Sequence, residues 1–226
     1  TKNGFFSARD GQPHEPLYPL VAKMFFWVFG SSDLHLRFVS FFFSILAVIL
    51  TYIVSKEIFK NRNIALISAG MITFNAYLIE QASMGLRLEL EMCFLLALFY
   101  FSYLKREVLG KWLWLIISGT IGGLWLLTKI YNLPVILFIF LYSVFSLRKV
   151  TLISKLIMFI LASLIALSFL LPCKINSLKT QGSFFYSSDI CTTYFANDEF
   201  KGKPGFPLSR VTLSEYFFKL HTPKQL

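Results

Sequence analysis

Long apolar stretches separated by short charged stretches dominate this chain. A helix needs about 20 apolar residues to cross a bilayer, and five blocks come close to that length: residues 36–55, 64–79, 92–104, 112–147 and 156–173. The fourth block is too long for one crossing and is interrupted near Asn132 and Pro134, which predict a turn because the residue before a proline avoids helical geometry. We therefore expect six transmembrane helices, unbroken except at Pro134.

The charged residues between the blocks predict an orientation. Three alternate short loops, 56–62, 105–111 and 148–155, carry nine positive and two negative charges: Lys56, Lys60, Arg62, Lys105, Arg106, Lys111, Arg148, Lys149 and Lys155 against Glu57 and Glu107. The two remaining loops carry Arg87 and Lys129 against Glu80, Glu89 and Glu91. Because cytoplasmic loops are enriched in Lys and Arg, the first set is predicted to be cytoplasmic and both ends of the chain to lie outside.

Composition agrees with a membrane protein. The chain is 56% hydrophobic and 18% aromatic, with a mean hydropathy of +0.63, which is too apolar for a soluble domain. A net charge of +10 would suggest nucleic acid as a partner of a soluble chain, but in a polytopic chain it reflects cytoplasmic loops. The predicted fold class is an all-α integral membrane protein, a polytopic helical bundle that binds no nucleic acid.

Three regions follow from this pattern. Residues 1–33 form an extracytoplasmic loop with a juxtamembrane helix over residues 16–29, which is too short to span and carries Trp27. Residues 34–173 form the transmembrane helical domain. Residues 174–226 are richer in Gly, Ser, Thr and Pro and form a partial extracytoplasmic segment. Since Thr1 is not an initiator and the chain stops without a recognisable ending, we expect a fragment of a longer protein.

The predicted topology places the unusual polar side chains on one side of the membrane. These residues are Asp10, His14, Glu15, Tyr18, Glu80, Gln81, Arg87, Glu89, Glu91 and Lys129. A charged side chain at mid-helix costs about 2.5–3.5 kcal/mol on insertion scales, so such groups usually face a cavity or a partner. The sequence therefore predicts one shared polar cavity at the outer face.

Several of these residues allow two interpretations. The Arg87 guanidinium suits a lipid phosphate, but Arg87 could equally reach the headgroups or pair with Glu80. Lys129 is either an interfacial anchor or a second phosphate contact. His14 and Glu15 could supply a general base or bind a divalent cation, or His14 could be an ordinary solvated loop residue. On a helix, Glu89 shares a face with Cys93 and not with Glu91.

Three stretches, in order along the chain, resemble a known superfamily. The stretch "HEPLYPLVAKMFFWVFGSSDLHLRFVSFFFSILAV" resembles the His-x-Pro-Leu-Tyr, aromatic-Gly and Arg-x-x-Ser succession of the GT-C membrane glycosyltransferases. "NAYLIEQASMGLRLELEMCFLLAL" is similar to their third-to-fourth helix corner, and "GLWLLTKIYNLPVILF" to their Leu-Thr-Lys segment. The closer resemblance is to the protein mannosyltransferase and aminoarabinose transferase superfamily, over residues 12 to 172. Ile130 replaces the usual glycine, and the family's Asp-Glu pair would precede this chain.

The resemblance implies transfer of a sugar from a polyprenyl-phosphate carrier to a lipid or protein acceptor on the extracytoplasmic face of a bacterial inner (plasma) membrane. It implies that Arg87 and Lys129 hold the donor phosphate, that Glu15, His14 and Asp10 are the catalytic candidates, and that Tyr18, Glu80, Gln81 and Glu89 line the substrate cavity. Whether a divalent metal takes part stays open. The alternatives are a polytopic transporter or flippase, for which midplane charges and broken helices would be typical, and a noncatalytic membrane subunit.

Overall fold

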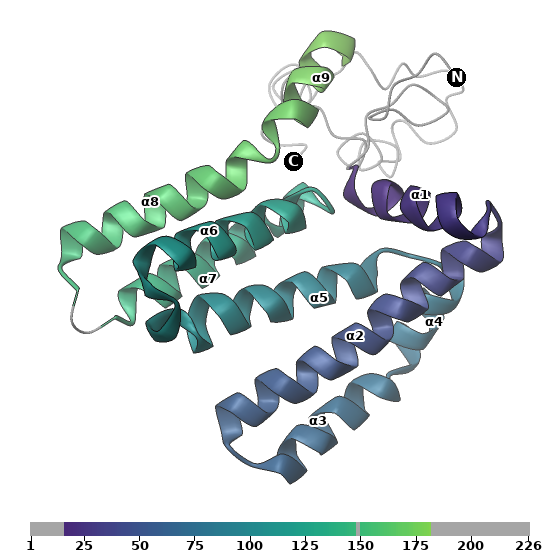
Figure 1. The fold of residues 1–226 in the computed structure, drawn as a ribbon, viewed down its shortest axis with the longest axis horizontal. Coiled ribbons are helices and arrows are strands. Elements are labelled where there is room, and N and C mark those ends of the chain that lie inside the picture. The colour runs from purple at the N-terminus through teal and green to yellow at the C-terminus, as the bar shows by residue number, and fades with distance from the viewer. Residues whose placement is uncertain (1–15, 148–149, 182–226) are drawn as a thin grey trace, which may run out of the picture. The chain divides into compact units, whose positions relative to one another are not determined.

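The structure is a computed structural model that describes residues 16–147 and 150–181, and every regular element in these ranges is helical. The all-α prediction is thus confirmed for this part of the chain. Two compact units are present, Glu15–Leu170 and Thr1–His14 with Leu171–Leu226. The second contributes α9 (Leu171–Gln181). The first contains α1 (Leu17–Phe29), α2 (Asp33–Phe59), α3 (Arg62–Thr73), α4 (Ala76–Met84), α5 (Leu88–Phe99), η1 (Tyr100–Leu104), α6 (Arg106–Leu126), η2 (Ile130–Asn132), α7 (Leu133–Phe145) and α8 (Leu152–Ser168) (Figure 1).

Two of the described helices are long and apolar enough to cross a membrane, α2 and the Val108–Leu126 part of α6. The number rises to as many as four when each bent helix pair is counted as one span. Large apolar side chains along α2, such as Phe38, Phe41 and Ile45, are exposed, as expected where a helix faces lipid. These helices indicate an integral membrane protein, whereas six crossings and their orientation stay predictions.

The segment 64–79 is not one unbroken helix. It divides into α3 and α4, which are bent by 51° relative to each other around Phe74 and Asn75. The Asn75 side chain accepts a hydrogen bond from the Leu78 N–H at 3.1 Å and so caps a new helix. The expectation that helices break only at Pro134 is therefore wrong, because a capping asparagine inside an apolar run started a second helix.

The predicted turn in the long fourth block is confirmed. Helix α6 ends at Leu126, and η2 leads into α7. Pro134 lies in the first turn of α7, where its missing N–H removes no helical hydrogen bond. The break itself falls a few residues earlier, at Leu127 to Asn132, so the proline begins the next helix.

Helices α5 to α8 surround a buried core that includes Trp114, Leu126, Phe140 and Ala162. Helix α8 packs closely on α6 because a glycine faces it: a Cβ atom at Gly119 would lie 2.6 Å from Cγ2 of Ile165. Small residues of this kind let helix backbones approach within a membrane. Packing around this core thus holds helices α5, α6 and α7 side by side.

The loops predicted to share the cytoplasmic side meet at one end of this unit. Lys105 Nζ donates to Glu57 Oε1 at 2.8 Å, joining the first basic loop to the second. Arg106 donates to the Ser143 carbonyl at 2.7 Å near the end of α7. The hydrogen bond to the Glu57 carboxylate raises the pKa of Lys105 above its ordinary value. Since α2, α5 and α7 begin at the opposite end, α1 and the residues around Arg87 lie there (Figure 1).

Candidate functional site

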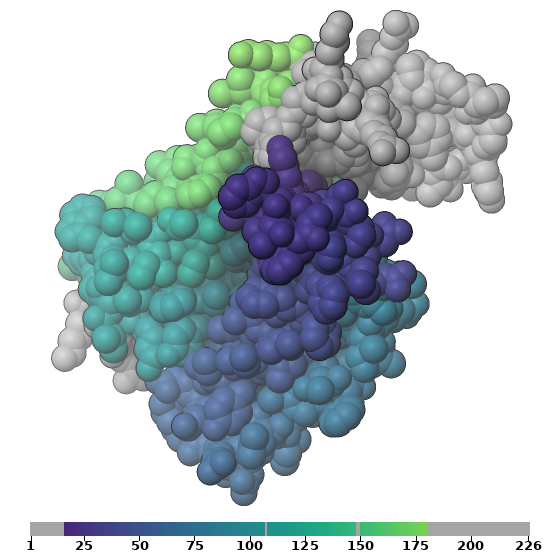
Figure 2. All heavy atoms as spheres, turned by 45° about the vertical axis from the view of Figure 1, so that its right-hand side comes forward, coloured from purple at the N-terminus to yellow at the C-terminus, as the bar shows by residue number. Residues whose placement is uncertain are grey.

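The first turn of α1 contacts two segments that are distant in sequence. The Leu17 N–H donates to the Leu127 carbonyl at 3.2 Å, which joins α1 to the turn after α6. The Tyr18 hydroxyl donates to the Gly85 carbonyl in the corner between α4 and α5. In the space-filling view α1, in dark purple, lies against the first part of α2 (Figure 2). One short helix therefore connects both loops that carry the predicted cations.

Tyr18 and Ser40 hold the corner between α4 and α5. Ser40 Oγ lies 3.0 Å from the Tyr18 hydroxyl and donates to the Leu86 carbonyl at 2.6 Å. Gly85 adopts a φ of 72° and ends α4, in a left-handed conformation that glycine tolerates best. Burial raises the pKa of Tyr18, so its hydroxyl stays protonated and can donate at neutral pH. Tyr18 thus fixes the backbone next to Arg87.

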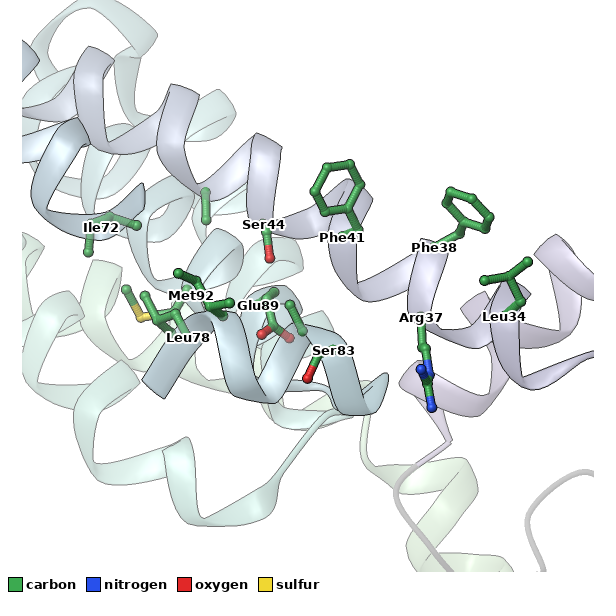
Figure 3. A pocket seen from close by; sticks show the side chains of 13 residues that line it. Leu34, Arg37, Phe38, Phe41, Ser44, Ile72, Leu78, Ser83, Glu89 and Met92 are labelled. Atoms are coloured by element: carbon green, nitrogen blue, oxygen red, sulfur yellow. The ribbon is translucent and has the colours of Figure 1, made fainter. Parts of the chain in front are cut away.

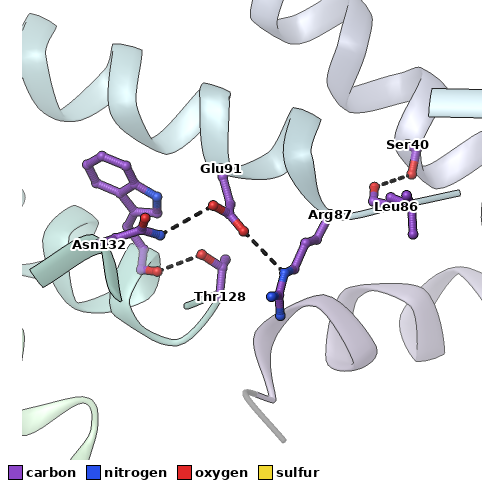
Figure 4. Close-up of polar contacts among 7 residues, drawn as sticks. Ser40, Leu86, Arg87, Glu91, Thr128 and Asn132 are labelled. Carbon is purple, nitrogen blue, oxygen red and sulfur yellow. Dashed lines mark hydrogen bonds and ion pairs between the residues drawn. The ribbon is translucent and has the colours of Figure 1, made fainter. Parts of the chain in front are cut away.

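Arg87 is the residue directly before α5. It belongs to a series of polar contacts that leads through Glu91 to Asn132, just before α7 (Figure 4). Its Nε lies 3.3 Å from Glu91 Oε1, and the Asn132 side chain donates to Glu91 Oε2 at 3.4 Å. A pair with Glu80 was one of the open interpretations of Arg87, and the ion pair in the structure is with Glu91, because residues four apart on a helix are neighbours. The Arg87 side chain is one-third exposed (34%), which leaves part of it accessible to a ligand.

Lys129 lies in the turn between α6 and η2 with an extended backbone. Its ammonium lies 5.9 Å from the centre of the Tyr131 ring, a distance within which cations are attracted to aromatic faces. The preceding residue, Thr128, is buried and donates to the Trp125 carbonyl at 2.7 Å, which stabilises the turn (Figure 4). Lys129 and Asn132 therefore share one turn, and Asn132 reaches the Glu91 partner of Arg87.

Glu89 lies on the other side of α5. It is only 2% exposed and lines a pocket between α2, α4 and α5 (Figure 3). Both of its carboxyl oxygens are buried and have no hydrogen-bond partner among residues 16–147 and 150–181. Cys93 is also buried, on the same face, as the spacing predicted. Glu89 and Glu91, both predicted to line one cavity, thus lie on two faces of α5.

The remaining predicted site residues fall into two groups. On α4, Glu80 is exposed and Gln81 is half-buried. Asp10, His14 and Glu15 lie outside the described residues. Within the described ranges there is no group of three or more His, Cys, Asp or Glu that could hold a metal ion.

Sequence reasoning missed Ser40 and Asn132, which hold the cation-bearing segments in place. The sequence predicts Asn132 only as a turn residue, and Ser40 stands within an apolar run where a serine carries no distinguishing pattern. The pairing of Arg87 with Glu91 could have been found from their spacing of four residues.

Comparison with known proteins identifies the family. Residues 12–175, well over half of the chain, match the family of the dolichyl-phosphate-mannose-protein mannosyltransferases. A search of curated proteins and a search of solved structures each give no match. The matched region contains α1, both cation-bearing segments and the core helices. This confirms the resemblance to membrane glycosyltransferases, and the chain belongs to the dolichyl-phosphate-mannose-protein mannosyltransferase family.

Proposed function

We propose that this protein transfers a sugar, held on a polyprenyl-phosphate carrier, to a lipid or protein acceptor on the extracytoplasmic side of the membrane. One observation carries the proposal beyond the family: the first turn of α1 is hydrogen-bonded to the segment before Arg87 and to the segment before Lys129. Two cations are thus presented beside the helix that directly follows the catalytic candidates His14 and Glu15. A single reaction centre at this end accounts for all three segments.

Arg87 and Lys129 are assigned to the donor phosphate. A phosphate leaving group gains negative charge as the sugar departs, and fixed positive charge nearby stabilises that change. The guanidinium can bind two phosphate oxygens at once, whereas the ammonium acts as a point charge. Glu91 and Asn132 would hold the Arg87 side chain in one orientation before the donor arrives. Arg87 is therefore the main phosphate ligand in this proposal, with Lys129 in support.

The acceptor needs a base. Its hydroxyl or amine attacks the anomeric carbon of the sugar, the bond from that carbon to the phosphate oxygen breaks, and the phosphate leaves with the bonding electrons. The proton of the acceptor passes to a carboxylate. Glu15 is the first candidate in this chain because it is two residues from Leu17, which is anchored to the turn after α6. Asp10 and His14 are the others, and His14 or Glu15 could hold a divalent metal instead.

The decisive experiment measures sugar transfer from radiolabelled polyprenyl-phosphate-mannose by the full-length protein in nanodiscs. Arg87→Lys keeps the charge but loses the bidentate geometry, and we expect kcat/KM to fall about ten- to a hundredfold, as for loss of one charge-assisted contact. Lys129→Ala should give a smaller loss. The control is Arg62→Lys, an exposed arginine at the opposite end of α2 and α3. Undiminished transfer by Arg87→Lys would refute the phosphate assignment.

The bend between α3 and α4 favours a second candidate, a lipid transporter, since discontinuous helices are typical of transporters. The residues at the break, Phe74 and Asn75, carry no charge, and the cations lie elsewhere. Reconstitution separates the two functions: a flippase would move labelled polyprenyl phosphate across the bilayer without cleaving a sugar from it. Movement without transfer would replace the transferase proposal.

A further inference from the structure

The pocket between α2, α4 and α5 is separate from the Arg87 site and has a volume of about 460 Å³. Its walls are mostly apolar, with Phe41, Leu78, Met92 and Ile72 along its length (Figure 3). Two groups break this pattern. Arg37 lies exposed at one end, and Glu89 lies in the wall with both carboxyl oxygens buried and without a hydrogen-bond partner among the residues that the structure describes. A buried polar group without a partner is costly, so the Glu89 carboxyl points to a ligand group that completes it.

The depths of these groups can be ordered along α2. Ser40 is bonded to the Leu86 carbonyl and the Cys93 thiol to the Phe43 carbonyl, so the first turns of α5 run beside residues 40 to 43. Glu89 therefore lies about one turn further along α2 than Arg37. Met92, Leu78 and Ile72 line the pocket beyond it (Figure 3). The order along the pocket is a cation, then a carboxyl group, then hydrocarbon.

A bilayer phospholipid has the same order of chemical groups. Its phosphate is anionic, its ester carbonyls follow, and its acyl chains come last. Within the described residues Arg37 forms no ion pair, so it can bind the phosphate. A protonated carboxyl can donate one hydrogen bond, and an ester carbonyl oxygen is an acceptor at the right depth. We propose that this pocket binds one anionic diacyl phospholipid, with its phosphate on Arg37, an ester oxygen on Glu89 and an acyl chain between α2 and α4.

The polyprenyl-phosphate carrier fits this pocket less well. Below its phosphate the carrier has only hydrocarbon, so it would leave the Glu89 carboxyl without a partner at the depth where a phospholipid offers an ester oxygen. The assignment concerns the α2–α4 face of α5 and does not rest on the proposed transfer reaction.

The test uses the full-length protein in nanodiscs doped with either phosphatidylglycerol carrying a diazirine in its acyl chain or a diazirine-bearing polyprenyl phosphate. After illumination, mass spectrometry locates the labelled residues. We expect the phospholipid probe to label residues 72–92. Arg37→Ala should reduce this labelling about tenfold, as for loss of a charge-assisted contact, and Glu89→Leu about three- to tenfold. Glu89→Gln keeps a hydrogen-bond donor and should retain most of the labelling.

Arg62→Ala is the matched control, an arginine in the first turn of α3 and away from the pocket. Folding is checked by the thermal unfolding of each variant, and Ala82→Phe, which fills the pocket from α4, provides a second way to displace the lipid without touching either polar group. Labelling by the phospholipid that is equal in all variants would overturn the proposal. So would labelling of residues 72–92 by the polyprenyl phosphate alone.

Discussion

Glu89 and Glu91 stand two residues apart at the start of α5 and have opposite surroundings. The two oxygens of Glu91 contact Arg87 Nε, just before α5, and the Asn132 side chain at the end of η2. Glu89 faces α2 and α4, and within the part of the chain that the structure describes neither of its oxygens has a hydrogen-bond partner. Residues two apart on a helix point to nearly opposite sides, because each residue turns the helix by about 100°. The carboxyl group on one face of α5 thus has partners within the protein, whereas the carboxyl group on the other face has none among the described residues.

The difference separates two uses of a carboxyl group near the membrane surface. A carboxylate with internal partners orients a cation, and here it holds the arginine that we assign to the donor. A buried carboxyl group without hydrogen-bond partners destabilises the protein. We therefore explain the position of Glu89 by a ligand that binds its carboxyl group. This contrast separates the proposed catalytic end from the proposed lipid pocket.

The strongest test of the difference between Glu89 and Glu91 is to replace each glutamate by leucine. Glu91→Leu should lower the free energy of unfolding by about 1.5–3 kcal/mol, because Arg87 loses a charged partner. Glu89→Leu should leave stability unchanged or raise it, because it removes a buried polar group that has no hydrogen bond. Denaturant unfolding in detergent micelles, where the pocket lipid is removed, measures both. Equal losses in the two variants would show that Glu89 has a partner within the protein.

Gly85 lies next to both faces of α5. It is two residues before Arg87, and it packs against Leu36 beside the lipid pocket. A Cβ atom there would lie 3.1 Å from Leu36 Cγ, and the φ of 72° adds about 1–2 kcal/mol of strain for an L-residue. Gly85→Ala should therefore lower stability and reduce both sugar transfer and lipid labelling.

The control for Gly85 is Gly30→Ala, which also has a positive φ, 87°, but has no atom within 4 Å of the added Cβ. Thermal unfolding of the two variants should place Gly85→Ala clearly below Gly30→Ala. If both variants lose the same stability, the close contact with Leu36 has no energetic role.

Tyr18 tests whether α1 positions the Arg87 face. Tyr18→Phe removes the hydroxyl that bonds the Gly85 carbonyl and should cost about 0.5–1.5 kcal/mol of stability. If the hydroxyl positions Arg87, KM for the polyprenyl-phosphate donor should rise more than kcat falls. A double-mutant cycle with Ser40→Ala should show coupling, because the two hydroxyls lie 3.0 Å apart. A loss of stability with unchanged donor KM would leave Tyr18 a structural residue only.

The smallest effect is expected at the opposite end, where Glu57 pairs with Lys105 in contact with solvent. The hydrogen bond to Glu57 raises the pKa of Lys105 above its ordinary value of 10.5. The same pairing lowers the pKa of the Glu57 carboxyl below its ordinary value of 4.5. The pair therefore stabilises the protein fully between pH 4.5 and pH 10.5, and this effect is lost as the pH rises through the raised pKa of Lys105 or falls through the lowered pKa of Glu57. The difference in unfolding temperature between wild type and Glu57→Gln should be small and should shrink above pH 10.5. A difference that grows above pH 10.5 would contradict this assignment.

The sequence by itself determined the elements that depend on neighbouring residues. The helix α1, the turn before α7 and the placement of Glu89 beside Cys93 all follow from local spacing, because helical geometry repeats along any apolar run. The helix cap at Asn75 is also a local feature. Because Asn75 stands within a long apolar run, the sequence does not predict the break between α3 and α4. The structure joins two of the three basic loops, through Glu57 and Lys105, and the common cytoplasmic side of all three stays a prediction.

Only the tertiary structure decided which of these elements meet. Leu17 bonds to Leu127, more than a hundred residues away, and Tyr18 to Gly85, and neither contact leaves a periodic trace in the sequence. The same holds for the two faces of α5. Spacing shows that Glu89 and Glu91 diverge, but it cannot show which of them meets Asn132 and which faces the pocket beside α2. That choice depends on how the helices pack, and packing is set by the shapes of side chains brought together from distant parts of the chain.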